Sequence, residues 1–288
     1  MSPLSETEDV IAEQRAAIAR RAQKRVAEIV AQAEAPGQRG AWTLFVREFL
    51  RFWSMARQTL VSPVITTMLY FLIFGYSLGD RLKTIQGIPY VDFLVPGLVM
   101  LALINNAYLN ASFSLFIGKI HGQTIDLLVT PLSYLQFMVA YISAAICRAM
   151  MVGTIIWGVS MVMGASAVFS LPIIFLFMIL TALMFSLLGL IVAIVAEEFD
   201  QVNLLPSFII TPLTFLGGVF YSIEMLPSPW DTVSRFNPVL YMVNGLRYGM
   251  TGIADVPVWQ GMVLVSTLCV GLGSVAWWLL KSGYNLRA

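Results

Sequence analysis

Six stretches of this chain are apolar for about twenty residues each, and together they fill most of the sequence after residue 57. A helix that crosses the hydrocarbon layer of a bilayer needs roughly 20 mainly apolar residues, because it rises about 1.5 Å per residue. The stretches of this length are 60–79, 93–117, 134–163, 169–196, 203–222 and 259–281. The pattern predicts an all-α integral membrane domain with six transmembrane helices.

Residues 37–57 have a different pattern. One helical face carries apolar and aromatic side chains, namely Phe45, Phe49, Phe52, Trp53 and Ala56. Another face carries Arg47, Arg51 and Ser54. An aromatic face opposite arginines is typical of a helix that lies in the membrane interface. We expect such an amphipathic interface helix here, and the alternative is a cytoplasmic extension of the first span.

Residues 1–36 are polar and contain a basic cluster, Arg20, Arg21, Lys24 and Arg25. They are interpreted either as a solvated cytoplasmic tail or as a helix that docks on a partner or on anionic lipid. The chain is thus divided into a tail (1–36), an interface helix (37–57) and a transmembrane domain (58–288).

Prolines interrupt the apolar pattern in two places. Pro206 and Pro212 lie within the fifth span, where proline kinks a helix. The region 223–258 contains four further prolines, and its apolar run from Pro238 to Gly252 is too short to cross a bilayer comfortably. We therefore expect re-entrant helices between spans five and six, buried in protein or lining a wet cavity.

Composition and charge distribution indicate a membrane protein and predict on which side of the membrane its termini lie. Hydrophobic residues make up 58% of the chain, and the net charge of +1 gives no reason to expect a nucleic-acid partner. With six spans, the basic residues outside the spans or at their ends number twelve on the side of the termini and four on the opposite side. Because cytoplasmic segments carry the excess of Lys and Arg, both termini are predicted to be cytoplasmic.

The sequence lacks the common catalytic patterns. Its single Gly-Lys pair, Gly118-Lys119, is followed by Ile120 and does not form a phosphate-binding loop. His121 is the sole histidine, which excludes a histidine-rich metal site. Glu224, Asp231 and Asp255 are the one acidic group that a membrane-embedded lipid-modifying enzyme could use, and their spacing fits no hydrolase pattern. We expect a non-enzymatic chain without a cofactor.

Arg148 is the charged residue that lies well inside a predicted span, 134–163. An arginine at membrane depth is costly and usually faces partners inside the bundle. Asn105 and Asn106 on the second span are expected at a similar depth. Arg148 is interpreted as an inter-helix clamp to these asparagines or, alternatively, as a contact for an anionic headgroup in transit.

Several motifs occur in an order and spacing that resemble a known family. They are Gln58–Gly75, the segment LLVTPLS at 127–133, TPLTFLGGVFYSIEMLP at 211–227, Asn237-Pro238 and Arg247-Tyr248-Gly249. Over residues 40 to 285 the chain resembles the permease subunits of ABC-2 type ABC exporters, in the branch of small bacterial inner-membrane permeases.

The resemblance implies two permease chains that work with two copies of a separate ATPase, which would hold ATP and magnesium. It also implies a coupling helix between spans two and three that contacts this ATPase. The residues expected to couple are Lys119, Gly122, Thr124, Asp126, Leu127 and Leu128, with Glu197 and Glu198 in the next loop on that side. The bilayer lipids are the remaining expected partners.

The substrate pathway is expected at the interface between two copies of the chain. Its candidate residues are aromatic and amide side chains: Tyr70, Phe71, Phe74, Asn105, Asn106, Tyr108, Arg148 and Phe215. Such groups suit a lipid-like, amphipathic or drug-like substrate, and the alternative is a polysaccharide or lipid-linked glycan. At helical spacing the same residues could equally be ordinary packing.

Overall fold

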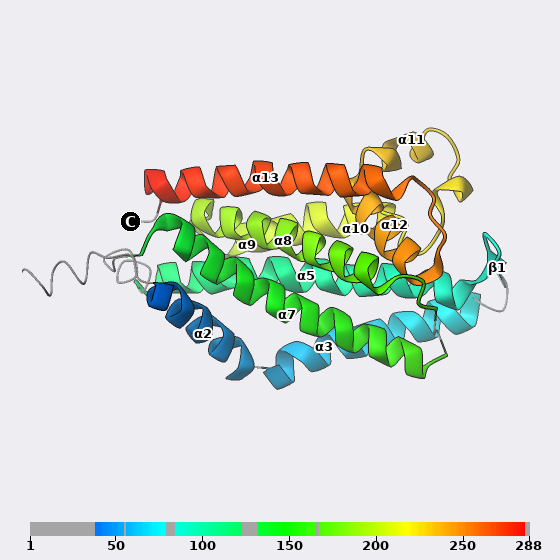
Figure 1. Cartoon of the computed structure of the whole chain (residues 1–288), viewed down its shortest axis with the longest axis horizontal. Coiled ribbons are helices and arrows are strands. Elements are labelled where there is room, and N and C mark those ends of the chain that lie inside the picture. The colour runs from blue at the N-terminus through cyan, green and yellow to red at the C-terminus, as the bar shows by residue number, and fades with distance from the viewer. Residues whose placement is uncertain (1–37, 55, 79–83, 123–131, 165–166, 286–288) are drawn as a thin grey trace, which may run out of the picture.

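The computed structural model describes residues 38–54, 56–78, 84–122, 132–164 and 167–285. Four long helices run side by side in it: α5 (Tyr90–Ile120), α7 (Tyr134–Val162), α8 (Leu171–Val195) and α13 (Val258–Ser282) (Figure 1). Each is long and apolar enough to cross a membrane. Four of the six predicted spans are thereby confirmed as helices of sufficient length and hydropathy, with ends that differ from the prediction by a few residues.

The segments predicted as spans one and five are helical but interrupted. The first is α3 (Ala56–Tyr70), which continues as the π-helix η1 (Phe71–Leu78). The fifth consists of α9 (Phe199–Leu205), the π-helix η2 (Pro206–Ile210) and α10 (Thr211–Leu216). The interruption coincides with Pro206, whose carbonyl accepts a hydrogen bond of 2.8 Å from the Thr211 hydroxyl. For these two segments the six-span arrangement stays a prediction.

The fifth segment ends earlier than predicted, and the second starts earlier. Helix α10 stops at Leu216 rather than at residue 222, because Gly217 caps it and Gly218 takes a φ of +74°. Before α5 lies a short antiparallel hairpin, β1 (Thr84–Ile85) and β2 (Ile88–Pro89). Its turn residues Gln86 and Gly87 have φ values of 51° and 82°, as a type I′ hairpin turn requires.

Between α10 and α13 the chain forms η3 (Ile223–Met225), α11 (Trp230–Arg235) and α12 (Pro238–Thr251). The sequence specifies both ends of α12: the Asn237 side chain accepts a hydrogen bond from the Val239 amide, and Gly252 ends the helix in the left-handed conformation. Helix α12 is inserted among α5, α8 and α13 at one end of the bundle (Figure 1). The short helices are as predicted, and their re-entry into a bilayer stays a prediction.

Two glycines allow α12 to approach α8 closely. A Cβ atom at Gly245 would lie 2.2 Å from the Phe177 ring, and one at Gly249 would lie 2.8 Å from the Ile174 side chain. Glycines four residues apart lie on one helical face, and such pairs permit tight helix contacts in membranes. The backbone carbonyl of Gly249 also accepts hydrogen bonds from the Phe169 and Ser170 amides, which precede α8.

Helix α2 (Gln38–Ser54) lies against α7 at the other end of the bundle (Figure 1). Its buried face consists of Leu44, Glu48 and Phe52, spaced four residues apart. This differs from the predicted aromatic face, since Trp53 is exposed and Phe45 and Phe49 are only half-buried. The buried Glu48 carboxylate at the centre of the contact explains the rotation, because it accepts a hydrogen bond from the Ser114 hydroxyl of α5.

Candidate functional site

The predicted coupling segments begin at one end of the bundle, where α5 and α8 end beside each other. The Lys119 ammonium donates hydrogen bonds to the carbonyl oxygens of Ile194, at 3.1 Å, and Ala196, at 2.8 Å. The last carbonyls of a helix have no partner within the helix, and a cation is favourable there. Lys119 therefore joins the C-terminal ends of two central helices.

Glu197 and Glu198 follow α8 directly and are exposed, so they are available to a partner at this end. Gly122 has a φ of +71° and turns the chain away after α5. The remaining predicted coupling residues, Thr124, Asp126, Leu127 and Leu128, lie outside the described residues. Asn285 donates a hydrogen bond of 3.0 Å to the Val195 carbonyl, so the C-terminal end of the described chain lies here as well.

At membrane depth, Arg148 of α7 bridges to α5. Its guanidinium donates to the side-chain carbonyl of Asn110 at 3.0 Å and to that of Asn106 at 3.4 Å, and it lies over the Phe52 ring of α2. The prediction of Asn106 as a partner is confirmed, and that of Asn105 is wrong. Asn105 points about 100° away from Asn106 around the helix and donates to its own helix, to the Leu101 carbonyl.

A second buried polar contact holds α2, and the sequence reading missed it. The Glu48 carboxylate, 3% exposed, pairs with Arg51 at 2.8 Å and with Arg47 at 3.4 Å, and it accepts a hydrogen bond from the Ser114 hydroxyl of α5. Arg51 also donates to the Ser114 carbonyl at 3.2 Å. A glutamate between arginines at i−1 and i+3 is the sequence signal that could have indicated this cluster.

We expect Arg148→Gln to lower the free energy of unfolding by about 1.5–3 kcal/mol, because it removes charge-assisted hydrogen bonds to Asn106 and Asn110. Thermal unfolding in detergent, followed by tryptophan fluorescence, measures the loss. If Arg148 acts as a clamp, transport per folded molecule is retained. Transport that falls while folded yield and unfolding temperature hold would contradict the clamp and favour a contact with the substrate.

Three predicted pathway residues gather in an aromatic cluster that consists of Tyr70, Phe74, Phe215 and Phe220. Phe220 lies at its centre, with ring centroids 4.5 Å from Phe74, 5.4 Å from Phe215 and 5.9 Å from Tyr70. The cluster joins the end of the first segment to that of the fifth. Phe220 was missed because the sequence placed it inside a fifth span that ran to residue 222, whereas it lies in the turn after Gly218.

The two remaining aromatic candidates for the pathway, Phe71 and Tyr108, are buried inside the chain. Phe71 is 2% exposed and turns toward the core rather than into the aromatic cluster. Tyr108 is fully buried, and its hydroxyl donates a hydrogen bond of 2.9 Å to the Val202 carbonyl of α9. Tyr108 therefore fixes α9 against α5.

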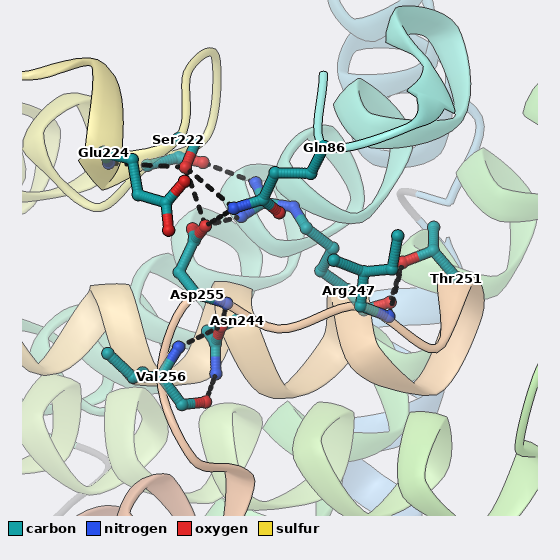
Figure 2. Close-up of polar contacts among 10 residues, drawn as sticks. Gln86, Ser222, Glu224, Asn244, Arg247, Thr251, Asp255 and Val256 are labelled. Carbon is teal, nitrogen blue, oxygen red and sulfur yellow. Dashed lines mark hydrogen bonds and ion pairs between the residues drawn. The ribbon is translucent and has the colours of Figure 1, made fainter. Parts of the chain in front are cut away.

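The opposite end of the bundle is held by an outer polar cluster, which consists of Gln86, Ser222, Asn244, Arg247 and Asp255 (Figure 2). The Asp255 carboxylate accepts from Gln86 and Ser222, each at 2.7 Å, and pairs with Arg247 at 3.3 Å. Side chains of both ionic partners are buried, at 0% and 1% exposed.

Further contacts tie the outer polar cluster to four segments of the chain. Arg247 donates to the Gly218 carbonyl at 2.5 Å and lies 3.8 Å over the Phe93 ring of α5. Asn244 accepts from the backbone amides of Asp255 and Val256 and donates to the Val256 carbonyl (Figure 2). The cluster thus connects the β-hairpin, the turn after α10, α12 and the loop before α13.

This geometry does not favour the hydrolytic alternative. Asp255 is occupied by its partners in the outer polar cluster, while Asp231 contacts the neighbouring Thr232. In the described part of the chain no three His, Cys, Asp or Glu side chains are grouped to hold a metal ion. The polar groups at this end therefore connect segments of the fold rather than converge on an open site.

Comparisons with known proteins agree with the resemblance seen in the motifs. The family described as ABC-2 type transporter matches residues 39–251. The chain is 39% identical over 247 residues to the inner membrane transport permease YadH of Escherichia coli K12, covering 86% of this chain and 95% of that protein. It is 26% identical over 242 residues to nodulation protein J of Rhizobium leguminosarum bv. trifolii, covering 82% and 89%.

Proposed function

Because this chain belongs to the ABC-2 type transporter family, we propose that it is the membrane subunit of an ATP-driven exporter in the inner membrane. Two copies would work with two copies of a separate ATPase, which holds ATP and magnesium. Both termini would lie in the cytoplasm. The permease chain itself moves the substrate and performs no bond-breaking chemistry.

The observation that carries this proposal is the contact made by Lys119. Through its bonds to Ile194 and Ala196, it holds the end of α5 next to the end of α8, after which the exposed Glu197 and Glu198 follow. Two helices whose following loops are both proposed to couple therefore end side by side, and this arrangement supports a docking surface for one partner. Lys119 connects α5 directly to α8. A displacement of the loop after either helix would therefore be transmitted to both helices.

We place the substrate pathway along the first and fifth segments, where the aromatic cluster lies. Both segments contain π-helical turns, which often occur at functional sites. Exposed apolar side chains on them, such as Leu72, Phe208 and Phe215, offer a surface to a second copy of the chain. The aromatic and aliphatic lining supports a lipid-like, amphipathic or drug-like substrate.

The proposed mechanism is a shift between two conformational states of the two permease chains. ATP binding would close the ATPase dimer and move the coupling segments. The nucleotide must bind the two states with different affinity, since equal affinity shifts nothing. We propose that the interrupted first and fifth segments move, while the outer polar cluster keeps α12 fixed to α5.

Co-purification tests the assembly directly. The tagged full-length chain, extracted gently from its native membrane, is expected to bring a phosphate-loop ATPase in a one-to-one ratio by mass spectrometry. A chain that arrives alone in several mild detergents would contradict the proposal. Substrates are then identified by their stimulation of ATP hydrolysis, with amphipathic compounds and lipid-linked glycans as competing candidates.

Charge reversal in the coupling segment is expected to separate ATP hydrolysis from transport. Asp126→Lys should abolish substrate-stimulated ATP hydrolysis and leave the unfolding temperature of the membrane chain unchanged, because a charge reversal opposes docking without altering the helix bundle. The matched control is Asp231→Lys at the opposite end. Coupling that survives Asp126→Lys, together with unchanged ATPase association, would show that the segment is placed wrongly.

A further inference from the structure

A groove lined mainly by apolar side chains runs along the outside of the bundle between α7 and α13, with α8 as its floor. It consists of two adjoining hollows of about 650 and 390 Å³, which share Met138, Val270 and Gly273. Leu183 and Leu187 of α8 form the floor. The groove is separate from the aromatic cluster and from every residue in the proposed substrate pathway.

The length of the groove matches one leaflet of a bilayer. Along α7 its lining extends from Leu135 to Ile146, which corresponds to about 16 Å of helix. The hydrocarbon layer is about 30 Å thick, so one leaflet supplies about 15 Å. A single acyl chain that enters from one interface would therefore occupy the whole groove.

Tryptophans on α13 give the depth of the groove. Trp259 and Trp278 are both exposed, near opposite ends of the helix, and their separation in sequence corresponds to about 28 Å of rise. Exposed tryptophans mark the two membrane interfaces, which are about 30 Å apart. The end of the groove at Trp277 and Trp278 thus lies at headgroup level, on the side of the predicted cytoplasm.

A positive charge lies at that end. The ammonium of Lys281 is exposed and lies 4.8 Å from the centre of the Trp277 ring. Within the described residues, no carboxylate forms an ion pair with it. A cation on an aromatic ring at the cytoplasmic surface is suited to a lipid phosphate.

The interior of the groove is suited to hydrocarbon. Its two serines, Ser143 and Ser274, donate their hydroxyl protons to carbonyls of their own helices, Ala140 at 3.1 Å and Val270 at 2.8 Å. Their donors are therefore already used. The remaining lining is aliphatic, aromatic or sulfur-containing, apart from the backbone of Gly273.

We propose that this groove binds an anionic phospholipid of the cytoplasmic leaflet, with one acyl chain between α7 and α13 and the phosphate at Lys281. The lipid would fill the groove between α7 and α13 and so fix α13 to the bundle. The proposal concerns a bound membrane component and is independent of the transported substrate.

Native mass spectrometry of the full-length chain in detergent tests the proposal, with phosphatidylglycerol and phosphatidylcholine as the added lipids. The groove is blocked by Gly273→Phe. A Cβ atom at this glycine meets nothing closer than Leu187, at 3.9 Å, so the ring enters the groove without displacing the backbone. The matched control is Gly271→Phe, since Gly271 has open space around it and does not line the groove.

The natural chain and Gly271→Phe are expected to retain one phosphatidylglycerol per chain, and Gly273→Phe is expected to lose it. Lys281→Gln should weaken phosphatidylglycerol binding about fivefold, as the loss of one charge near a phosphate predicts, and leave phosphatidylcholine unaffected. Equal lipid retention by Gly273→Phe and Gly271→Phe would overturn the groove as the site. Equal affinity for the two lipids would overturn the role of Lys281.

A second variant covers the case in which Gly273→Phe does not fold. Val270 is 70% exposed and borders both hollows, so Val270→Trp fills the groove from its surface without disturbing the core. It is expected to lose the lipid in the same way. Retention of the lipid by a folded Val270→Trp variant would overturn the proposal equally.

Discussion

Replacing Arg247 with leucine is expected to lower the free energy of unfolding by roughly 3–5 kcal/mol, because removal of one partner leaves a buried charge uncompensated. The Asp255 carboxylate is 1% exposed and would keep only its neutral donors, Gln86 and Ser222. The Gly218 carbonyl would lose its donor as well. Unfolding in detergent, followed by tryptophan fluorescence, measures the change.

Two further variants serve as comparisons for Arg247→Leu. Arg235→Leu removes an exposed arginine at the same end of the bundle and is expected to change stability by less than about 0.5 kcal/mol. The double variant Arg247→Leu with Asp255→Asn removes both charges and should be more stable than Arg247→Leu alone. If Arg247→Leu unfolds at the same temperature as Arg235→Leu, the two buried charges are not paired in the folded chain.

The outer polar cluster also indicates which parts of the chain move together. It connects the β-hairpin, α12 and the loop before α13 through side chains that have few alternative partners (Figure 2). The Asp255 carboxylate is paired with Arg247, Gln86 and Ser222, and buried polar groups paired in this way tend to specify one arrangement. The first and fifth segments have no comparable network in the described structure, and they contain the π-helical turns. We therefore expect the conformational change of transport in these two segments.

The long spans could be predicted because one property determines them. A helix in hydrocarbon must satisfy its backbone internally and present apolar side chains all round, so length and hydropathy suffice to find α5, α7, α8 and α13. The interrupted segments were harder to place. Pro206 indicated where the fifth segment changes geometry, but the end at Leu216 depends on the backbone at Gly217 and Gly218.

The polar contacts could be predicted only in part, because pairing depends on helix rotation. The sequence identified Arg148 as a charge that needs partners, and Asn106 is one of them. Asn110 rather than Asn105 completes the pair, since residues four apart share a helical face. The Arg247–Asp255 pair was not foreseen, because both residues fell in a region whose local structure the sequence left open.

Packing of α12 on α8 supplies the other large expected effect. Gly245→Val is expected to destabilise the chain by about 3 kcal/mol or more, since a Cβ atom there would overlap the Phe177 ring, which is itself fully buried. Gly158→Val is the matched control, because a Cβ atom at Gly158 meets nothing within 4 Å. The same fluorescence-detected unfolding compares the two, and Gly245→Ala should fall between them.

Equal stability of Gly245→Val and Gly158→Val would mean that α12 does not lie against α8 in the folded protein. A loss confined to Gly245→Val would instead show that close backbone contact holds the short helix against α8, as the predicted re-entrant arrangement requires.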